Sequence, residues 1–72
     1  MKNIEALIAD GGEITLGAIG RIDCAATAAD GHNCLAMLAR REGETLNALL
    51  RRLDKAIASV VSGGDPVDEI NG

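Results

Sequence analysis

The densest group of potentially reactive side chains lies between Asp30 and Cys34, a stretch that holds the only histidine and one of the two cysteines. A histidine in contact with a cysteine can act as the base that generates a thiolate nucleophile. Two residues apart on a strand, His32 and Cys34 would point to the same side. A catalytic pair also needs an orienting group, an oxyanion site and a cleft, which a short hairpin does not offer. We therefore expect a turn here, and no enzyme.

A metal site built from Cys24, His32 and Cys34 fails on spacing. Structural zinc sites bring their ligands in close pairs such as Cys-x-x-Cys, and the sequence has no such pair. The strand pattern places Cys24 and Cys34 on opposite faces, which also makes a disulfide between them geometrically poor. We expect two free thiols, with Cys34 the more reactive, and neither a metal nor a cofactor.

The middle of the chain is basic although the whole chain is acidic, with a formal net charge of −4. Such asymmetry can define a face for a partner, which we expect to be a protein. The alternative is that these charges are solvated or paired with nearby acidic residues. The candidate partner-binding residues are Arg40, Arg41, Arg51, Arg52 and Lys55.

The sequence predicts two helices. Asn3 can cap a short one that ends at Asp10-Gly11-Gly12. The second runs from about Thr45 to Ser62, because apolar residues recur there at spacings of three and four. Gly63-Gly64 and Pro66 follow it in the order typical of a helix end. The expected apolar seam of this helix consists of Leu46, Leu49, Leu50, Leu53, Ile57 and Val60.

Residues 14–29 alternate small or apolar side chains with polar ones, which is the period of a strand. Gly17 and Gly20 are expected to mark a bulge or a bend within it. The alanine-rich part of this segment is also compatible with a helix, so an all-α fold is the alternative.

Asp30-Gly31 is a favoured hairpin turn, after which residues 32–41 would run back as the second strand. With these two residues as the loop, Ala26 faces Leu35, Cys24 faces Met37 and Ile22 faces Ala39. That register puts the large apolar side chains on one face of the sheet, the requirement for a one-sided core. The sheet part of the core or of a dimer seam would then be formed by Ile22, Cys24, Leu35 and Met37.

The expected fold is α+β: a short helix, a hairpin, a long helix (residues 45–62) packed on the sheet, and an acidic flexible tail at 65–72. Residues 1–72 form one small domain. A chain of this length without Phe, Tyr or Trp makes a marginal core. Two strands are also marginal in water and leave both edges open. We therefore expect a homodimer to complete the structure.

Composition excludes several classes of function. A pI near 4.7 argues against sequence-independent binding to nucleic acid, which requires clustered cations. The lack of aromatic residues removes base stacking as a route to single strands. No apolar run is long enough for a membrane span, and residues 1–5 do not read as a signal peptide. We expect a soluble cytoplasmic protein.

Residues 35–57, LAMLARREGETLNALLRRLDKAI, resemble short uncharacterised proteins of phages, prophages and mobile elements of proteobacteria. Their shared pattern is a strand ending in Arg-Arg, then Gly-Glu-Thr/Ser-Leu, then Leu-Leu-x-Arg-Leu-Asp-x-Ala-Ile. A closing Asp-Glu-Ile-Asn is present here at residues 68–71. The resemblance covers the C-terminal half to two thirds of the chain and implies no activity.

Residues 43–46, Gly-Glu-Thr-Leu, are also similar to the turn of HicB-type antitoxins, in which strands precede a Gly-Asp-Thr-like turn and an amphipathic helix. The sequence shows no third strand with that family's proline- and glycine-rich segment. It also lacks room for a DNA-binding element. This resemblance therefore implies only a similar shape.

The favoured function is stoichiometric binding to a host macromolecule by a small phage or mobile-element protein of the inhibitor or counter-defence type. A HicB-like antitoxin or regulator is one alternative. Another is a sponge for a small anionic ligand at a dimer interface, gripped by the arginines named above.

Overall fold

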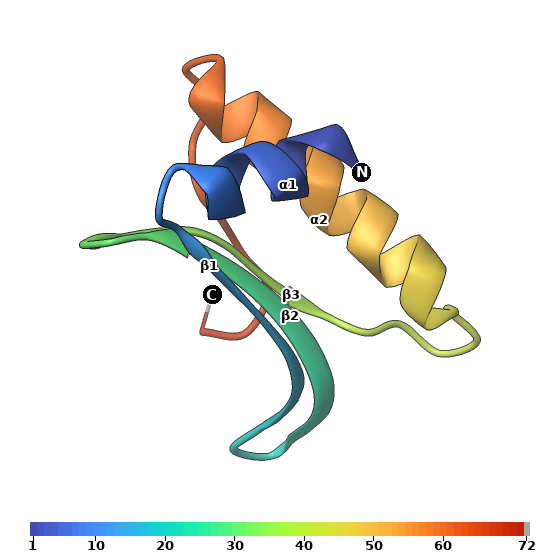
Figure 1. Cartoon of the computed structure of the whole chain (residues 1–72). Coiled ribbons are helices and arrows are strands. Elements are labelled where there is room, and N and C mark those ends of the chain that lie inside the picture. The colour runs from blue at the N-terminus through green and yellow to red at the C-terminus, as the bar shows by residue number, and fades with distance from the viewer. Residues whose placement is uncertain (72) are drawn as a thin grey trace.

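The chain forms two helices that lie on the same face of a four-stranded sheet (Figure 1). The computed structural model describes residues 1–71, so Gly72, the last residue of the expected tail, lies outside the described residues. The α+β class is confirmed, and the all-α alternative is wrong. The elements in chain order are α1 (Lys2–Ala9), β1 (Glu13–Ile19), β2 (Ile22–Asp30), β3 (Asn33–Ala39), α2 (Leu46–Val61) and β4 (Val67–Asp68).

The segment 14–29, predicted as one strand, is two antiparallel strands, so that prediction is wrong. Gly20 has a φ of +56°, a left-handed conformation that glycine adopts without steric penalty. The chain therefore reverses at Gly20-Arg21 instead of bending, and Ile19 pairs with Ile22. A register shift between Gly17 and Ile19 adds the expected irregularity. The sheet thus has three antiparallel strands before α2.

The predicted register between the second and third of these strands is also wrong. Asp30 pairs with Asn33, so the turn is Gly31-His32. The pairing then skips Leu35, which places Leu38 opposite Ala26 where Leu35 was expected. Alanines are small enough to be buried on both faces of β2, so the requirement for a single apolar face did not select the register.

The core lies between α2 and the sheet. Thr45 caps α2, as predicted: its hydroxyl accepts a hydrogen bond of 3.1 Å from the Ala48 N–H. The helix buries Leu49, Leu53 and Ile57 against the alanine-rich centre of β2 and β3. The sheet contributes three alanines and two leucines to this cluster, so α2 supplies most of its large side chains together with Leu7 of α1.

Asn3 does not cap α1, because Met1 occupies the cap position and makes no capping bond through its side chain. The Asn3 amide instead donates to Asp54 Oδ2 at 3.0 Å, and the Ile4 N–H donates to Asp54 Oδ1 at 2.9 Å. Burial alone would raise the pKa of Asp54, but these hydrogen bonds lower it below its usual value. Asp54 therefore fastens α1 to α2.

The C-terminal segment returns to the sheet (Figure 1). β4 pairs in parallel with β3 through Val67 and Ala36, and the Glu69 N–H donates to the Met37 carbonyl at 2.8 Å. The flexibility expected for residues 65–72 stays a prediction. Among the described residues, no helix is both long and apolar enough to cross a bilayer.

Candidate functional site

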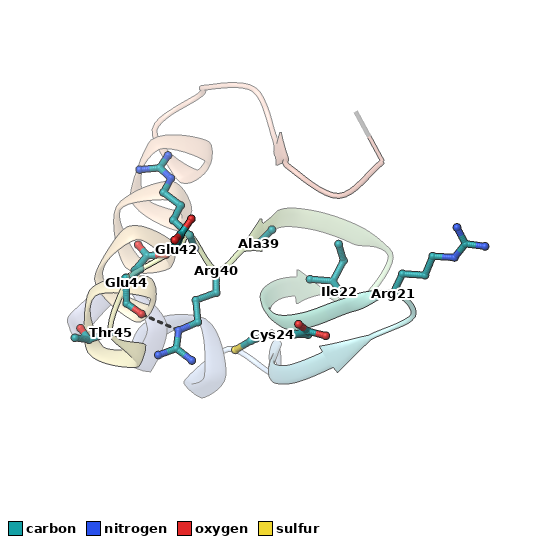
Figure 2. A pocket seen from close by; sticks show the side chains of 11 residues that line it. Arg21, Ile22, Cys24, Ala39, Arg40, Glu42, Glu44 and Thr45 are labelled. Atoms are coloured by element: carbon teal, nitrogen blue, oxygen red, sulfur yellow. Dashed lines mark hydrogen bonds between the residues drawn. The ribbon is translucent and has the colours of Figure 1, made fainter.

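A depression of about 600 Å³ lies where β2 begins, β3 ends and the loop to α2 starts (Figure 2). We call it the arginine hollow. It is open to solvent, and its lining residues come from two separate segments of the chain, 21–24 and 39–45. Those that concern its chemistry are Arg21, Asp23, Arg40, Arg41, Glu42 and Glu44.

The loop at residues 40–45 is held by its own side chains. Gly43 reverses the chain with a φ of +77°, which brings Glu44 back toward the residues that leave β3. The Arg41 N–H donates to Glu44 Oε1 at 3.0 Å. Arg40 Nε donates to the Glu44 carbonyl at 2.7 Å, the bond drawn as a dashed line in Figure 2. The Arg40 N–H also donates to the Cys24 carbonyl at 3.0 Å, which ties the loop to β2.

Arg52 supports this loop from α2. Its Nε and Nη2 bind the two carboxylate oxygens of Glu44 at 2.7 and 3.0 Å, the bidentate geometry that suits a guanidinium. Nη2 also donates to the Ala39 carbonyl at 3.0 Å, and Nη1 to Glu69 Oε2 at 2.8 Å. Most donors of Arg52 are therefore used inside the protein, whereas we had expected this residue to face a partner.

These contacts fix the charge of Glu44. The hydrogen bonds from Arg52 and from the Arg41 N–H lower the pKa of Glu44 from 4.5 to about 2. A carboxylate with so low a pKa is a weak proton acceptor near neutral pH, where general bases need a pKa close to the working pH. The contact also raises the pKa of Arg52. The pair therefore supports a rigid polar surface better than it supports proton transfer.

The other expected partner-binding residues remain available to a partner. The Arg41 side chain is 66% exposed and reaches Glu69 only at 3.8 Å. Arg51 and Lys55 are exposed and form no ion pair with any residue in the range 1–71. We call Arg40, Arg41, Arg51 and Lys55 the arginine surface.

Sequence reasoning missed Arg21 and Glu69. Arg21 was assigned to the middle of a strand, but it lies in the β1–β2 turn and lines the arginine hollow, with its guanidinium directed away from it (Figure 2). The preceding glycine was the signal for that turn. Glu69 was assigned to a flexible tail, yet it accepts hydrogen bonds from Arg52 and from the Ala39 N–H. No local pattern indicated this long-range contact.

The residues first considered for thiol chemistry are apart from the hollow, except for Cys24. His32 and Cys34 are exposed at the β2–β3 turn, where Cys34 Sγ lies 3.9 Å from the Ala36 carbonyl. Cys24 is half-buried, lines the hollow and packs against the core. Both thiols are free, and residues 1–71 contain no group of three or more candidate metal ligands.

The predicted core residues divide into four groups by burial. Leu35, Leu49, Leu53 and Ile57 are buried, and Cys24, Leu50 and Val60 are half-buried against them. Ile22 and Met37 are half-buried outside this cluster, since Met37 pairs with Thr27 while the adjacent Leu38 enters the core. Leu46, in the first turn of α2, is 44% exposed.

A second depression, of about 480 Å³, lies between α1 and the C-terminal half of α2. Its lining is mainly apolar, with Leu7, Leu35 and Ile57 at its base, and Asp10 and Asp30 also line it. No basic side chain lines it, so it differs in chemistry from the arginine hollow.

No protein-family model, no curated protein and no solved structure matches this chain.

Proposed function

We propose that this protein is a non-catalytic binder that acts by stoichiometric occupation of a protein partner through the arginine surface. The observation that carries the proposal is that one arginine of this region is bound inside the protein while others are exposed. Arg52 uses most of its donors to hold the loop, while Arg41 in the loop and Arg51 on α2 remain exposed. A surface whose backbone is held in advance loses less entropy when it binds.

The mixed charge of the arginine hollow favours a protein over a small anion. Three arginines and three acidic residues line it, so their formal charges cancel. A site for a free phosphate or nucleotide needs converging cations or backbone N–H groups with few competing carboxylates. Interleaved charges of both signs instead resemble the polar rim of a protein interface. The anionic sponge at a dimer interface is therefore the weaker alternative.

The class of partner is inferred from the resemblance of residues 35–57 to small phage and mobile-element proteins. That resemblance supports a host protein as the target, in the manner of an inhibitor or counter-defence protein acting in the cytoplasm.

The test is quantitative capture from a lysate of the organism that encodes the chain. The tagged full chain should retain one protein in a constant molar ratio, and titration with that purified protein should give one partner per chain. Replacing Arg41 and Arg51 with glutamate should raise the Kd by about tenfold or more, since charges at an interface steer association and suppress mismatched contacts.

Lys2→Glu is the matched control, because Lys2 is an exposed cation on α1, away from the hollow. It changes net charge in the same direction and should leave the Kd within about twofold. Equal Kd values for wild type and the Arg41/Arg51 double variant would exclude the arginine surface. Absence of any partner in a fixed ratio would contradict the proposal as a whole.

An antitoxin-like regulator is the second candidate, and one observation favours it. Three antiparallel strands precede the Gly43-Glu44-Thr45 turn and α2, one more than the sequence predicted, although none of the three contains a proline. This candidate predicts a toxin gene beside the gene for this chain. Co-expression should restore growth of cells that produce that toxin, and unrelieved toxicity would contradict it.

A further inference from the structure

The first strand of the sheet has an unpaired side. The strand order is β1-β2-β3-β4, so β1 pairs with β2 on one side only. At the other end of the sheet, β4 covers part of β3 through Ala36 and Met37. The free backbone N–H and C=O groups of an edge strand can pair with another strand.

β1 has few of the features that prevent an edge strand from pairing with another molecule. Glu13, at its start, is its only charged residue, and the strand has no proline or lysine. The register shift between Gly17 and Ile19 distorts the far end. The regular part, residues 13–17, is therefore a five-residue edge open to pairing.

An exposed leucine lies in this edge. Leu16 is 44% exposed, and its neighbour on the same face, Ile14, packs against the core. A two-fold antiparallel pairing centred near residues 15 and 16 would bring Leu16 beside Ile14 or Leu16 of a second copy. The two Glu13 side chains would then lie at opposite ends of the ladder, so they would not repel each other. The edge is therefore complementary to itself.

The large accessible surface and the alanine-rich core of the molecule also favour self-association. Its accessible surface is 4,699 Å², while the scaling for a monomer of this mass gives about 4,200 Å². Four of its ten buried apolar residues are alanines, which contribute little buried area each. Small domains with such cores are commonly completed by a second subunit.

We propose that residues 13–17 of β1 pair antiparallel with the same residues of a second copy, so that two four-stranded sheets join into one across a two-fold axis. This goes beyond the proposed function, because none of the four residues of the arginine surface lies in β1 and the proposed function does not require a dimer.

Solution mass and two leucine variants test the interface. The full chain should show twice its monomer mass of 7.4 kDa by light scattering. Leu16→Glu should raise the dimer dissociation constant at least about tenfold, because it buries a charge against an apolar neighbour. Leu46→Glu is the matched control: it is the same residue with the same 44% exposure, but on α2, and should leave the constant unchanged.

A monomer at all concentrations up to about 1 mM would overturn the proposal, since a dimer that weak has little stability. A Leu16→Glu protein that dimerises like wild type would also overturn it.

Cysteine cross-linking covers the case in which Leu16→Glu does not fold. In a Cys24→Ser/Cys34→Ser background, Thr15→Cys or Leu16→Cys should form a covalent dimer on mild oxidation, because residues near a two-fold axis face their own copies at disulfide distance. Leu46→Cys should not. Cross-linking that is no stronger at either 15 or 16 than at 46 would contradict pairing through β1.

Discussion

At the scale of single residues, Arg51 and Arg52 are adjacent and chemically identical but have different roles. Arg51 and Arg52 are adjacent on α2, and on a helix adjacent side chains point about 100° apart. Arg51 therefore faces solvent, while Arg52 reaches the loop, the end of β3 and the tail. The direction of each side chain, and not its charge, decides which one is available to a partner.

Arg52→Ala should lower the free energy of unfolding by about 1–3 kcal/mol, because Glu44 would keep only the Arg41 N–H as a donor and the Ala39 carbonyl would lose the Arg52 donor. Urea denaturation followed by circular dichroism measures this. Arg51→Ala should stay within about 0.5 kcal/mol of wild type. Arg52→Lys should restore only part of the lost stability, since lysine has no planar guanidinium that can bind both carboxylate oxygens at once. Equal effects at 51 and 52 would contradict the role assigned to Arg52.

The lowered pKa of Glu44 makes stability depend on pH. Because its pKa is about 2 in the folded chain and 4.5 ordinarily, its contribution is complete above pH 4.5 and is lost as the pH falls through 2. The lowered pKa values of Asp54 and Asp68 act in the same direction. Denaturant midpoints measured from pH 7 to pH 2 should therefore fall.

Glu44→Gln is the variant that assigns this effect. Its midpoint should lie below that of wild type at pH 7, and the difference should shrink toward pH 2, where the wild-type carboxyl also becomes protonated. A difference that is constant across the range would show that the carboxylate charge is not responsible.

At the level of elements, α2 organises the molecule. Its apolar stripe faces the sheet, its Thr45 cap ends the supported loop, and Asp54 fastens α1 to it. Damage to this helix should therefore reach both the core and the arginine hollow.

Leu53→Ala should destabilise the fold by about 2–5 kcal/mol, because Leu53 is fully buried and its removal leaves a cavity. In a chain this small that loss is a large part of the total stability. Thermal unfolding followed by circular dichroism measures it. Leu46→Ala, at a half-exposed position of the same helix, should cost less than about 1 kcal/mol. Similar melting temperatures for Leu53→Ala and wild type would mean that α2 is not the main core element.

Across the whole molecule, the C-terminal segment packs against the end of β3 and contacts the loop that carries Arg40 and Arg41. Glu69 receives hydrogen bonds from Arg52 and from the Ala39 N–H, 30 residues away in sequence, while β4 pairs with β3. The end of the chain therefore contributes to the candidate site.

Glu69→Gln should loosen this closure without unfolding the protein. The Ala39 amide hydrogen, now bound to Glu69 Oε1 at 3.1 Å, should exchange with solvent several-fold faster in the variant. Amide exchange followed by NMR measures this, and the Leu49 amide in α2 is the internal control. Unchanged exchange at Ala39 would mean that the tail does not hold the loop in solution.

The sequence alone determined those features that depend on neighbouring residues. The apolar spacing and the Thr45 cap predicted α2 almost to its ends, and alternation predicted extended structure over residues 14–29, although as one strand instead of two. Helix periodicity and capping act over a few residues, so a local pattern contains them. The expectation that the basic residues in the middle of the chain form a face for a partner stays a prediction.

Tertiary structure alone decided the register, the β1–β2 turn and the role of each arginine. Leu38 instead of Met37 enters the core because β3 skips one residue at Leu35, and the small alanines of β2 accept either alternation. Arg52 supports the loop because the tail and the end of β3 meet at its guanidinium. These outcomes depend on contacts between residues far apart in the chain, whose free energies no local pattern contains.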